Sequence, residues 1–277
     1  MTHLAELKKH YQEGRLIPFI GAGISMSVTW EEGGKPKRGP SWAELVNQAA
    51  RVLGFTMPDL LRVRGTDMQI LEYFKIKQKG ETQLLKNWLL KSMLPPDQAL
   101  KLSSIHRELA KLTKCKLFYT TNFDDFIERA FAIHKRPHRA VAIESEMGDG
   151  GASCEIIKFH GDLNHPQEMV LSESEYERRL SLSSPMDYRL IGDLLGRVLL
   201  FLGYSFRDVN VSYLFRRIDE QFKQFKGVHS GRRAYIVVPD PSDFEIELFE
   251  DRHIAVIPVS GLNMTQHVAD LLKRLRG

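Results

Sequence analysis

Short, unbroken apolar runs alternate with amphipathic segments along most of this chain. The first run, "RLIPFIGAG" at residues 15–23, is apolar until it reaches Gly21. Runs without polar alternation are typical of strands buried on both faces of a parallel sheet. On this basis we expect further strands at residues 116–122, 140–143, 155–161, 168–172, 198–205, 233–239 and 254–259.

The segments between these runs have helical spacing. Residues 42–53 are the clearest case, because Ser41 and Glu44 form a capping box and Gly54 follows the last apolar position. We expect further helices at residues 1–13, 67–79, 82–93, 103–114, 185–197 and 208–226, with short helices after 239 and 259.

Strands that alternate with helices predict an α/β fold: a doubly wound, mostly parallel, Rossmann-like sheet. Residues 42–114 contain no convincing strand, so we expect a helical insertion there. The whole chain, 1–277, is interpreted as one domain with this insertion. Residues 28–40 are punctuated by Gly and Pro and are expected to form a loop.

The amino-acid composition excludes fewer classes of function than the pattern of apolar and polar positions does. The 277 residues are 43% hydrophobic, which is ordinary for a globular protein, and the net charge is only +4. No Lys/Arg stripe with interleaved aromatic residues is present, which disfavours nucleic-acid binding. Lys35, Lys37 and Arg38 fit either a solvated surface or a contact with a ligand phosphate.

The two cysteines, Cys115 and Cys154, form no CxxC pair and therefore no four-cysteine zinc site. Neither a signal peptide nor an apolar run long enough to span a bilayer is apparent. We therefore expect a cytoplasmic protein without a membrane anchor and without a bound metal.

Polar or glycine-containing segments follow four of the predicted strands: "GAGIS", "TTNFDD", "HGD" and "GYSFRD". In doubly wound sheets, ligands bind beyond the carboxyl ends of the strands. Gly21 and Gly23 would let the backbone turn tightly and approach an anion, and Ser25 could donate a hydroxyl. A simple turn at the end of the strand is the alternative.

A dehydrogenase fingerprint is not present. Met26 stands where the third glycine of G-x-G-x-x-G would fall. Glu44, at the distance of a ribose-binding acid, belongs to a capping box with no strand before it. Both departures argue against hydride transfer.

The other strand ends carry candidate catalytic groups. Asn122 and Asp124 could contact a ligand, or they could form a turn and cap the next helix. His160 ends an apolar strand and precedes Gly161, and imidazole accepts protons near neutral pH. A purely structural histidine is the alternative reading.

Taken together, in this order and spacing, the four segments resemble the sirtuin-like fold. They resemble in particular the NAD-hydrolysing effectors of bacterial antiphage defence, the Thoeris-type NADases. The flanking segments "PSWAELV", "HPQEMVLSESEYERR" and "SYLFRRI" agree with this resemblance, which spans nearly the whole chain. The paired cysteines of the sirtuin zinc module are absent from the sequence, which puts protein deacylation in doubt.

The resemblance implies a role for each matching residue. NAD would be the substrate, with its pyrophosphate and adjacent ribose held by the first segment. Asn122 and Asp124 would address the nicotinamide ribose and the attacking water, and His160 would be the base. The residues implied to bind NAD are Gly21, Ala22, Gly23, Ser25, Thr121, Gly203 and Ser205, with Thr121 where sirtuin deacylases have Gln.

The implied reaction is hydrolysis of NAD to nicotinamide and ADP-ribose. Two other readings stay open: an NAD-dependent lysine deacylase, and a sensor that binds NAD or ADP-ribose without turnover. Because an unrestrained NADase would poison its own cell, we expect gating by homo-oligomer assembly, a separate regulatory protein or a small-molecule activator.

Overall fold

The computed structural model describes residues 3–148, 154–181, 183–205 and 234–277. At its centre is a seven-stranded sheet in the order β5-β6-β4-β1-β7-β8-β9, and every neighbouring pair is parallel. Its strands are β1 (Leu16–Ile20), β4 (Leu117–Thr120), β5 (Arg139–Val141), β6 (Glu155–Lys158), β7 (Val198–Leu202), β8 (Ala234–Pro239) and β9 (Ile254–Val259). The predicted doubly wound parallel α/β fold is confirmed. The helix predicted at 208–226 lies outside the described residues.

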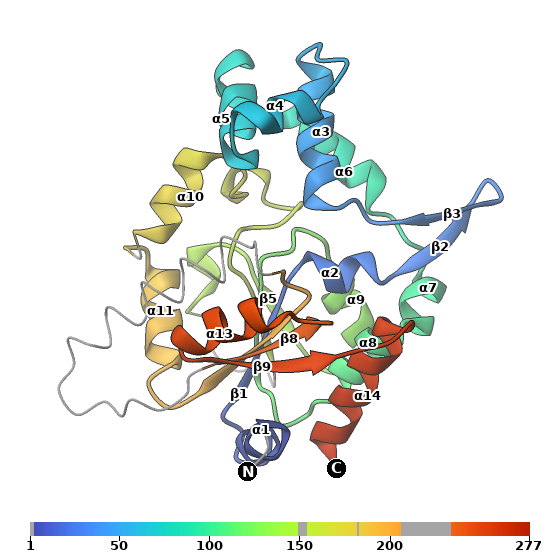
Figure 1. Ribbon diagram of the computed structural model, residues 1–277, viewed down its shortest axis with the longest axis vertical. Coiled ribbons are helices and arrows are strands. Elements are labelled where there is room, and N and C mark those ends of the chain that lie inside the picture. Colours follow the sequence, from blue (N-terminus) through green and yellow to red (C-terminus); the bar gives the residue numbers. More distant parts are fainter. Residues whose placement is uncertain (1–2, 149–153, 182, 206–233) are drawn as a thin grey trace.

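Helices cover both faces of this sheet, as Figure 1 shows. Successive side chains of β1 point to opposite faces, so Leu16 and Ile20 join one apolar cluster while Ile17 and Phe19 join the other. The first face is covered by α1 (His3–Gln12), α8 (Ser104–Ala110), α9 (Phe126–Ile133) and α14 (Met264–Arg276). The second is covered by α11 (Pro185–Asp193) and α13 (Asp243–Asp251).

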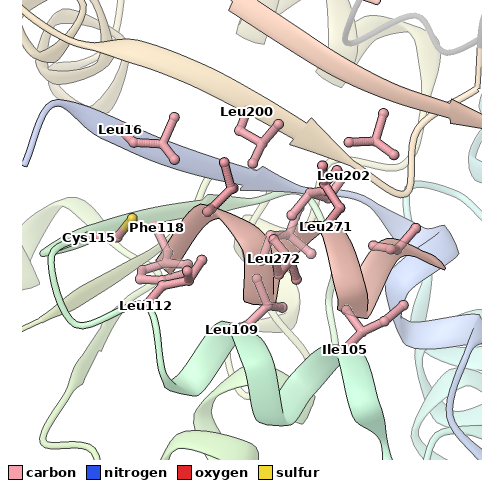
Figure 2. Packing of buried hydrophobic residues seen from close by; sticks show 14 of the residues in the cluster. Leu16, Ile105, Leu109, Leu112, Cys115, Phe118, Leu200, Leu202, Leu271 and Leu272 are labelled. Carbon is pink, nitrogen blue, oxygen red and sulfur yellow. The ribbon is translucent and has the colours of Figure 1, made fainter. Parts of the chain in front are cut away.

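Figure 2 shows the first of these clusters in detail. Leu200 and Leu202 of β7 lie over side chains from α8 and α14, among them Leu109 and Leu272. All four of these residues are buried, and burying apolar area of this kind contributes about 25 cal/mol per Å². The cluster therefore fixes the sheet against α8 and α14.

Four helices stand apart from the sheet, at the top of Figure 1. They are α3 (Trp42–Val52), α4 (Asp59–Arg64), α5 (Asp67–Lys77) and α6 (Gln83–Ser92), and we call them the helical module. They have their own apolar cluster around Leu45, Phe74 and Leu89. By contrast, α7 (Asp97–Leu102) and α8 pack with α9 beside the sheet. The elements within residues 42–114 are thus all helices, of which α3 to α6 stand apart from the sheet.

Two local expectations differ from the structure, and further short elements were not expected. Residues 28–40 contain a hairpin, β2 (Thr29–Glu32) and β3 (Lys35–Arg38), instead of a loop. Gly33 and Gly34 have φ values of 61° and 74°, which suits the tight turn of a two-residue hairpin. Residues 168–172 are not a strand, and the short helix η2 (Pro166–Glu168) precedes them. The unexpected α10 (Glu173–Leu180) follows, and another short helix, η1 (Glu144–Glu146), follows β5.

Strand β1 lies at the topological switch point of the sheet. The chain continues from β1 to β4 on one side and returns later to β7 on the other. Such a point opens a crevice beyond the carboxyl ends of the strands, where doubly wound folds bind ligands.

Among the described helices, none has the combined length and apolar character that crossing a bilayer requires.

Candidate functional site

The turns after β1 and β7 interlock at this crevice. The Gly21 N–H donates to the Leu202 carbonyl oxygen at 2.8 Å, and the Gly23 N–H donates to the Gly203 carbonyl oxygen at 3.0 Å. Gly203 has φ +76°, and a Cβ there would lie 2.6 Å from the Ile24 nitrogen. These glycines are required by the close approach of two backbones, and two of the N–H groups expected to bind phosphate are already engaged.

The side chain of Asn122 lies against this turn. Its Nδ2 donates to the Gly21 carbonyl oxygen at 3.1 Å and to the Ser25 Oγ at 2.7 Å. A carbonyl oxygen can only accept, so the nitrogen of the amide has to face Gly21, and this fixes the orientation of the amide. The Oδ1 atom is buried and has no hydrogen-bond partner among the described residues.

Asp124 joins the same network. The Ser25 Oγ donates to Asp124 Oδ2 at 2.7 Å, and the other carboxyl oxygen accepts the Phe126 N–H at 3.1 Å. Asp124 therefore forms a turn just before α9, whose N-cap is Asp125, and is also a neighbour of Asn122, so a turn-forming role and a place in the site are compatible. Burial raises the pKa of the Asp124 carboxyl, and the charge of Lys158 opposes that rise.

Lys158, which the sequence analysis did not single out, lies beneath this network. It ends β6, is only 1% exposed, and its Nζ contacts the Asp124 carbonyl oxygen and lies 3.1 Å from Glu128 Oε1. Burial alone would lower the pKa of Lys158, but Glu128 and Asp124 outweigh it and raise the pKa. A lysine within the otherwise apolar "IIKF" was the available signal, because a buried charge requires a partner.

His160 is placed differently from the expectation. It is 1% exposed, stacks on Phe159 and meets the Tyr176 ring edge-on at 5.0 Å between centroids. Burial, with the nearby Arg179 charge, lowers the pKa of His160 to about 3, so the ring is neutral at pH 7. Among the described residues His160 lines neither of the two cavities at this edge of the sheet.

The larger of these cavities, about 530 Å³, we call the Asn122 cavity. Its polar side consists of Ser25, Thr121, Asn122, Asp124 and Ser205. Its apolar side comes mainly from the helical module and from α10, through Trp42, Leu45, Met68, Leu89, Met93 and Tyr176. Tyr176 thus stands between this cavity and His160.

A second cavity of about 420 Å³, the Gly203 cavity, lies beside the interlocked turns. Gly23 and Gly203 line it, while Ala22, Trp42 and Ser205 line both cavities. The two are therefore adjacent, and each has the size of a small-molecule site. Gly21 lines neither cavity among the described residues, and its carbonyl oxygen accepts a hydrogen bond from Asn122.

Thr121 is held at the junction of the two turns. Its Oγ1 hydrogen-bonds the Tyr204 hydroxyl at 2.9 Å, and that hydroxyl donates to the Ile20 carbonyl oxygen at 3.0 Å.

In the described part of the chain, no three His, Cys, Asp or Glu side chains are arranged to hold a metal ion.

A parallel α/β sheet with adjoining cavities at its switch point is typical of doubly wound folds, which bind ligands beyond the carboxyl ends of the strands. Residues 116–257, just over half of the chain, match the SIR2-like domain family. The chain belongs to that family.

The curated relatives share one description, "NAD(+) hydrolase ThsA". The protein of Bacillus cereus (strain MSX-D12) is 25% identical over 98% of this chain and 56% of its own length. Those of Acinetobacter baumannii (strain 532279) and Enterococcus faecium are 26% and 28% identical over 80% and 72% of this chain. The chain spans about half the length of the curated relatives it matches.

One solved structure, described as "Structural Basis for the Mechanism and Regulation of Sir2 Enzymes", aligns over 100% of this chain and 99% of its own. Its TM-score is 0.43 and its sequence identity 12%.

Proposed function

We propose that this chain is an NAD hydrolase that cleaves the bond between nicotinamide and ribose to give nicotinamide and ADP-ribose. The family and the four relatives described as NAD(+) hydrolases support this reaction. The observation that carries the proposal is the anchored Asn122 amide beside a cavity at the switch point of the sheet.

The chemistry suits a site built for positioning. The nicotinamide ring of NAD carries a pyridinium charge, so it leaves as a neutral molecule without a general acid. The ribose then resembles an oxocarbenium ion, and water has to meet it from a defined direction, as in glycoside hydrolysis. Asn122 would hold that water or the ribose hydroxyls, and correct positioning alone contributes several orders of magnitude in rate.

In this proposal His160 has a smaller part than a general base near neutral pH would have. With a pKa of about 3, its ring is a weak proton acceptor. Water that attacks a cationic carbon needs little help from a base, so the reaction tolerates this. For His160 to take the proton, the Tyr176 ring, which lines the cavity in front of it, has to move aside.

The two cavities suggest how the dinucleotide would lie. The nicotinamide ribose would occupy the Asn122 cavity, and the rest of NAD would pass Ala22 and Ser205 into the Gly203 cavity. Gly21, Gly23 and Gly203 have no side chains, so the two turns pack closely and would leave space for the dinucleotide beside them. Thr121 would line the cavity without taking part in the reaction. The proposed reaction uses no metal.

The biological setting is part of the same proposal. We infer a cytoplasmic effector of bacterial antiphage defence whose activity is gated by self-association, by a separate regulatory protein or by a small activator. The name ThsA of the relatives supports the defence setting.

The test is release of nicotinamide from NAD by the purified protein. We expect turnover by the wild type and a loss of about 100-fold or more in Asn122→Ala, because the water loses its orientation. His160→Ala should lose activity to a smaller extent. Ser103→Ala is the matched control, since Ser103 is a buried serine bonded to His106 away from both cavities.

The competing outcomes are distinct. Equal turnover by the wild type and both site variants would contradict the proposal. NAD consumption only in the presence of an acyl-lysine peptide would indicate a deacylase, and tight binding without product would indicate a sensor. A rate per molecule that stays constant across protein concentrations would contradict gating by self-association.

A further inference from the structure

We propose that the Tyr176 ring is a closed gate between His160 and the Asn122 cavity, and that contacts between α5 and α10 hold it in this position. This inference rests on the proposed NAD hydrolysis and names a regulatory element of that site. Tyr176 is buried, lines the Asn122 cavity and meets the His160 ring edge-on. His160 itself lines neither cavity among the described residues.

The Tyr176 ring contacts two aromatic side chains from different parts of the molecule. Its centroid lies 5.0 Å from that of His160, at 82°, and 6.3 Å from that of Trp42, at 73°. Edge-on packing of this kind is a favourable arrangement of aromatic rings. Trp42 belongs to α3 of the helical module, whereas His160 follows β6 of the sheet. The ring is therefore held both by the module and by the segment that carries His160.

The backbone next to Tyr176 is fixed to α5, which lies beside α10 in Figure 1. Lys75 Nζ lies 2.6 Å from Glu175 Oε1. Glu72 Oε2 accepts the Ser174 N–H at 3.0 Å and the Ser174 hydroxyl at 2.9 Å. We call these contacts the α5–α10 latch. Since Ser174 and Glu175 directly precede Tyr176 in α10, the latch sets the position of the ring.

The ion pair of the latch is partly shielded from water, because neither Lys75 nor Glu175 is fully exposed. Salt screens such a pair less than it screens a pair on the surface. Glu175 Oε2 accepts the N–H groups of Leu171 and Ser172, so the carboxylate is already in place to receive Lys75. A displacement of α5 is therefore transmitted to Tyr176. An activator that moves α5 would shift the balance between the closed and the open gate.

An open gate would add the His160 ring to the wall of the Asn122 cavity. In the closed structure burial, with the Arg179 charge, lowers the pKa of His160 to about 3, which makes the ring a weak base. Contact with water in the cavity would raise that pKa towards its ordinary value, so the ring would accept a proton more readily. The closed gate therefore holds the reaction below its full rate.

Labelling of the histidines with diethyl pyrocarbonate tests the gate without any need for activity. The reagent acylates neutral imidazole, and His160 is neutral at pH 7, so slow labelling reports burial of the ring. His165 is 34% exposed and lies in the same tryptic peptide, where it serves as the internal reference. We expect wild-type His160 to react at least about tenfold more slowly than His165. Lys75→Met should raise the His160 rate at least about threefold, and Tyr176→Ala should raise it further.

Nicotinamide release tests what the gate does to the reaction. Lys75→Met should raise kcat/KM for NAD at least about threefold, because His160 reaches the cavity more often. Adding His160→Ala to Lys75→Met should remove this gain. The matched control is Lys77→Met, which makes the same change on the same helix at an exposed lysine over the Tyr73 ring. It should alter neither the labelling of His160 nor kcat/KM.

The results that would overturn the gate are specific. Wild-type His160 that reacts as fast as His165 would show that the ring leaves His160 open. Equal His160 labelling in the wild type and Lys75→Met would show that the latch does not hold the ring. A gain in Lys75→Met that survives His160→Ala, or no gain at all, would show that Tyr176 does not limit the use of His160.

Failure of the gate and failure of the proposed function give different results. If neither the wild type nor Lys75→Met releases nicotinamide, the proposed NAD hydrolysis is contradicted, and the labelling still decides whether Tyr176 closes off His160. If Tyr176→Ala unfolds at a much lower temperature than the wild type, the comparison of Lys75→Met with Lys77→Met decides. Equal labelling in those two variants contradicts the gate.

Discussion

Two buried histidines, His106 and His160, make the stability of this protein depend on pH. Burial lowers the pKa of His106 to about 4 and that of His160 to about 3, the latter with a contribution from the Arg179 charge. In the unfolded chain both would titrate near 6.5. Between those values and 6.5 the unfolded state binds more protons than the folded state, so stability falls as the pH is lowered through that window.

At pH 5 each histidine should remove about 2 kcal/mol of the stability present at pH 7. We therefore expect His106→Gln to lose about 2 kcal/mol less than the wild type between pH 7 and pH 5. Urea unfolding of both proteins at the two pH values measures this difference, in which other titrating groups cancel. An equal loss in the two proteins would show that His106 is protonated in the folded state.

At the scale of residues, the sequence predicted contacts between neighbouring residues better than it predicted which side chains bury a given residue. The capping box of Ser41 and Glu44 is confirmed, because it depends on four consecutive residues. The meeting of Asn122 with Ser25 follows from parallel strands ending at one edge. The burial of His160 could not be predicted, because it depends on Tyr176 of a helix that the sequence pattern did not reveal.

At the scale of elements, the packing of the β1 and β7 turns leads to a prediction at Gly203. Alanine there would have φ +76° and a Cβ 2.6 Å from the Ile24 nitrogen and 2.8 Å from the Gly21 carbonyl oxygen. Both contacts are with backbone, which cannot turn away. We expect Gly203→Ala to destabilise the fold by about 1–3 kcal/mol and to displace the carbonyl that holds Asn122.

The matched control is Gly196→Ala, just before β7. Gly196 has no atom within 4 Å of a built Cβ and no positive φ, so alanine there should be neutral or slightly stabilising. Thermal unfolding of the two variants compares them directly. Equal stability of Gly203→Ala and Gly196→Ala would mean that the interlocked turns separate readily.

The elements themselves were predictable to different degrees. The buried strands are recognisable in the sequence as apolar runs, and β9 begins and ends where the sequence predicted. The hairpin at Thr29–Arg38 was missed because its exposed strands have no apolar side, although two adjacent glycines favoured a tight turn. Helical periodicity predicted α8 but not α7, and it did not predict that both pack against α9, which only the tertiary structure supplies.

At the scale of the whole molecule, the helical module shares an apolar cluster with the segments that follow β4 and β6. Met169 and Leu171, from the segment before α10, belong to the same cluster as Phe74 of α5 and Leu89 of α6. Ion pairing adds to this, since Lys75 of α5 lies 2.6 Å from Glu175 of α10. The Asn122 cavity lies between these two parts, with its polar side on the sheet and its apolar side on the module.

A ligand in that cavity should therefore stabilise both parts together. ADP-ribose, the proposed product, should raise the free energy of unfolding by about 2.7 kcal/mol at 100 times its dissociation constant, because it binds only the folded state. Amide hydrogen exchange should slow at the start of α3 and at residues 121–124, which line opposite sides of the cavity. It should stay unchanged in α1, no residue of which lines either cavity. Protection confined to the sheet would show that the module takes no part in binding, and no stabilisation at saturating ADP-ribose would contradict the placement of the dinucleotide in these cavities.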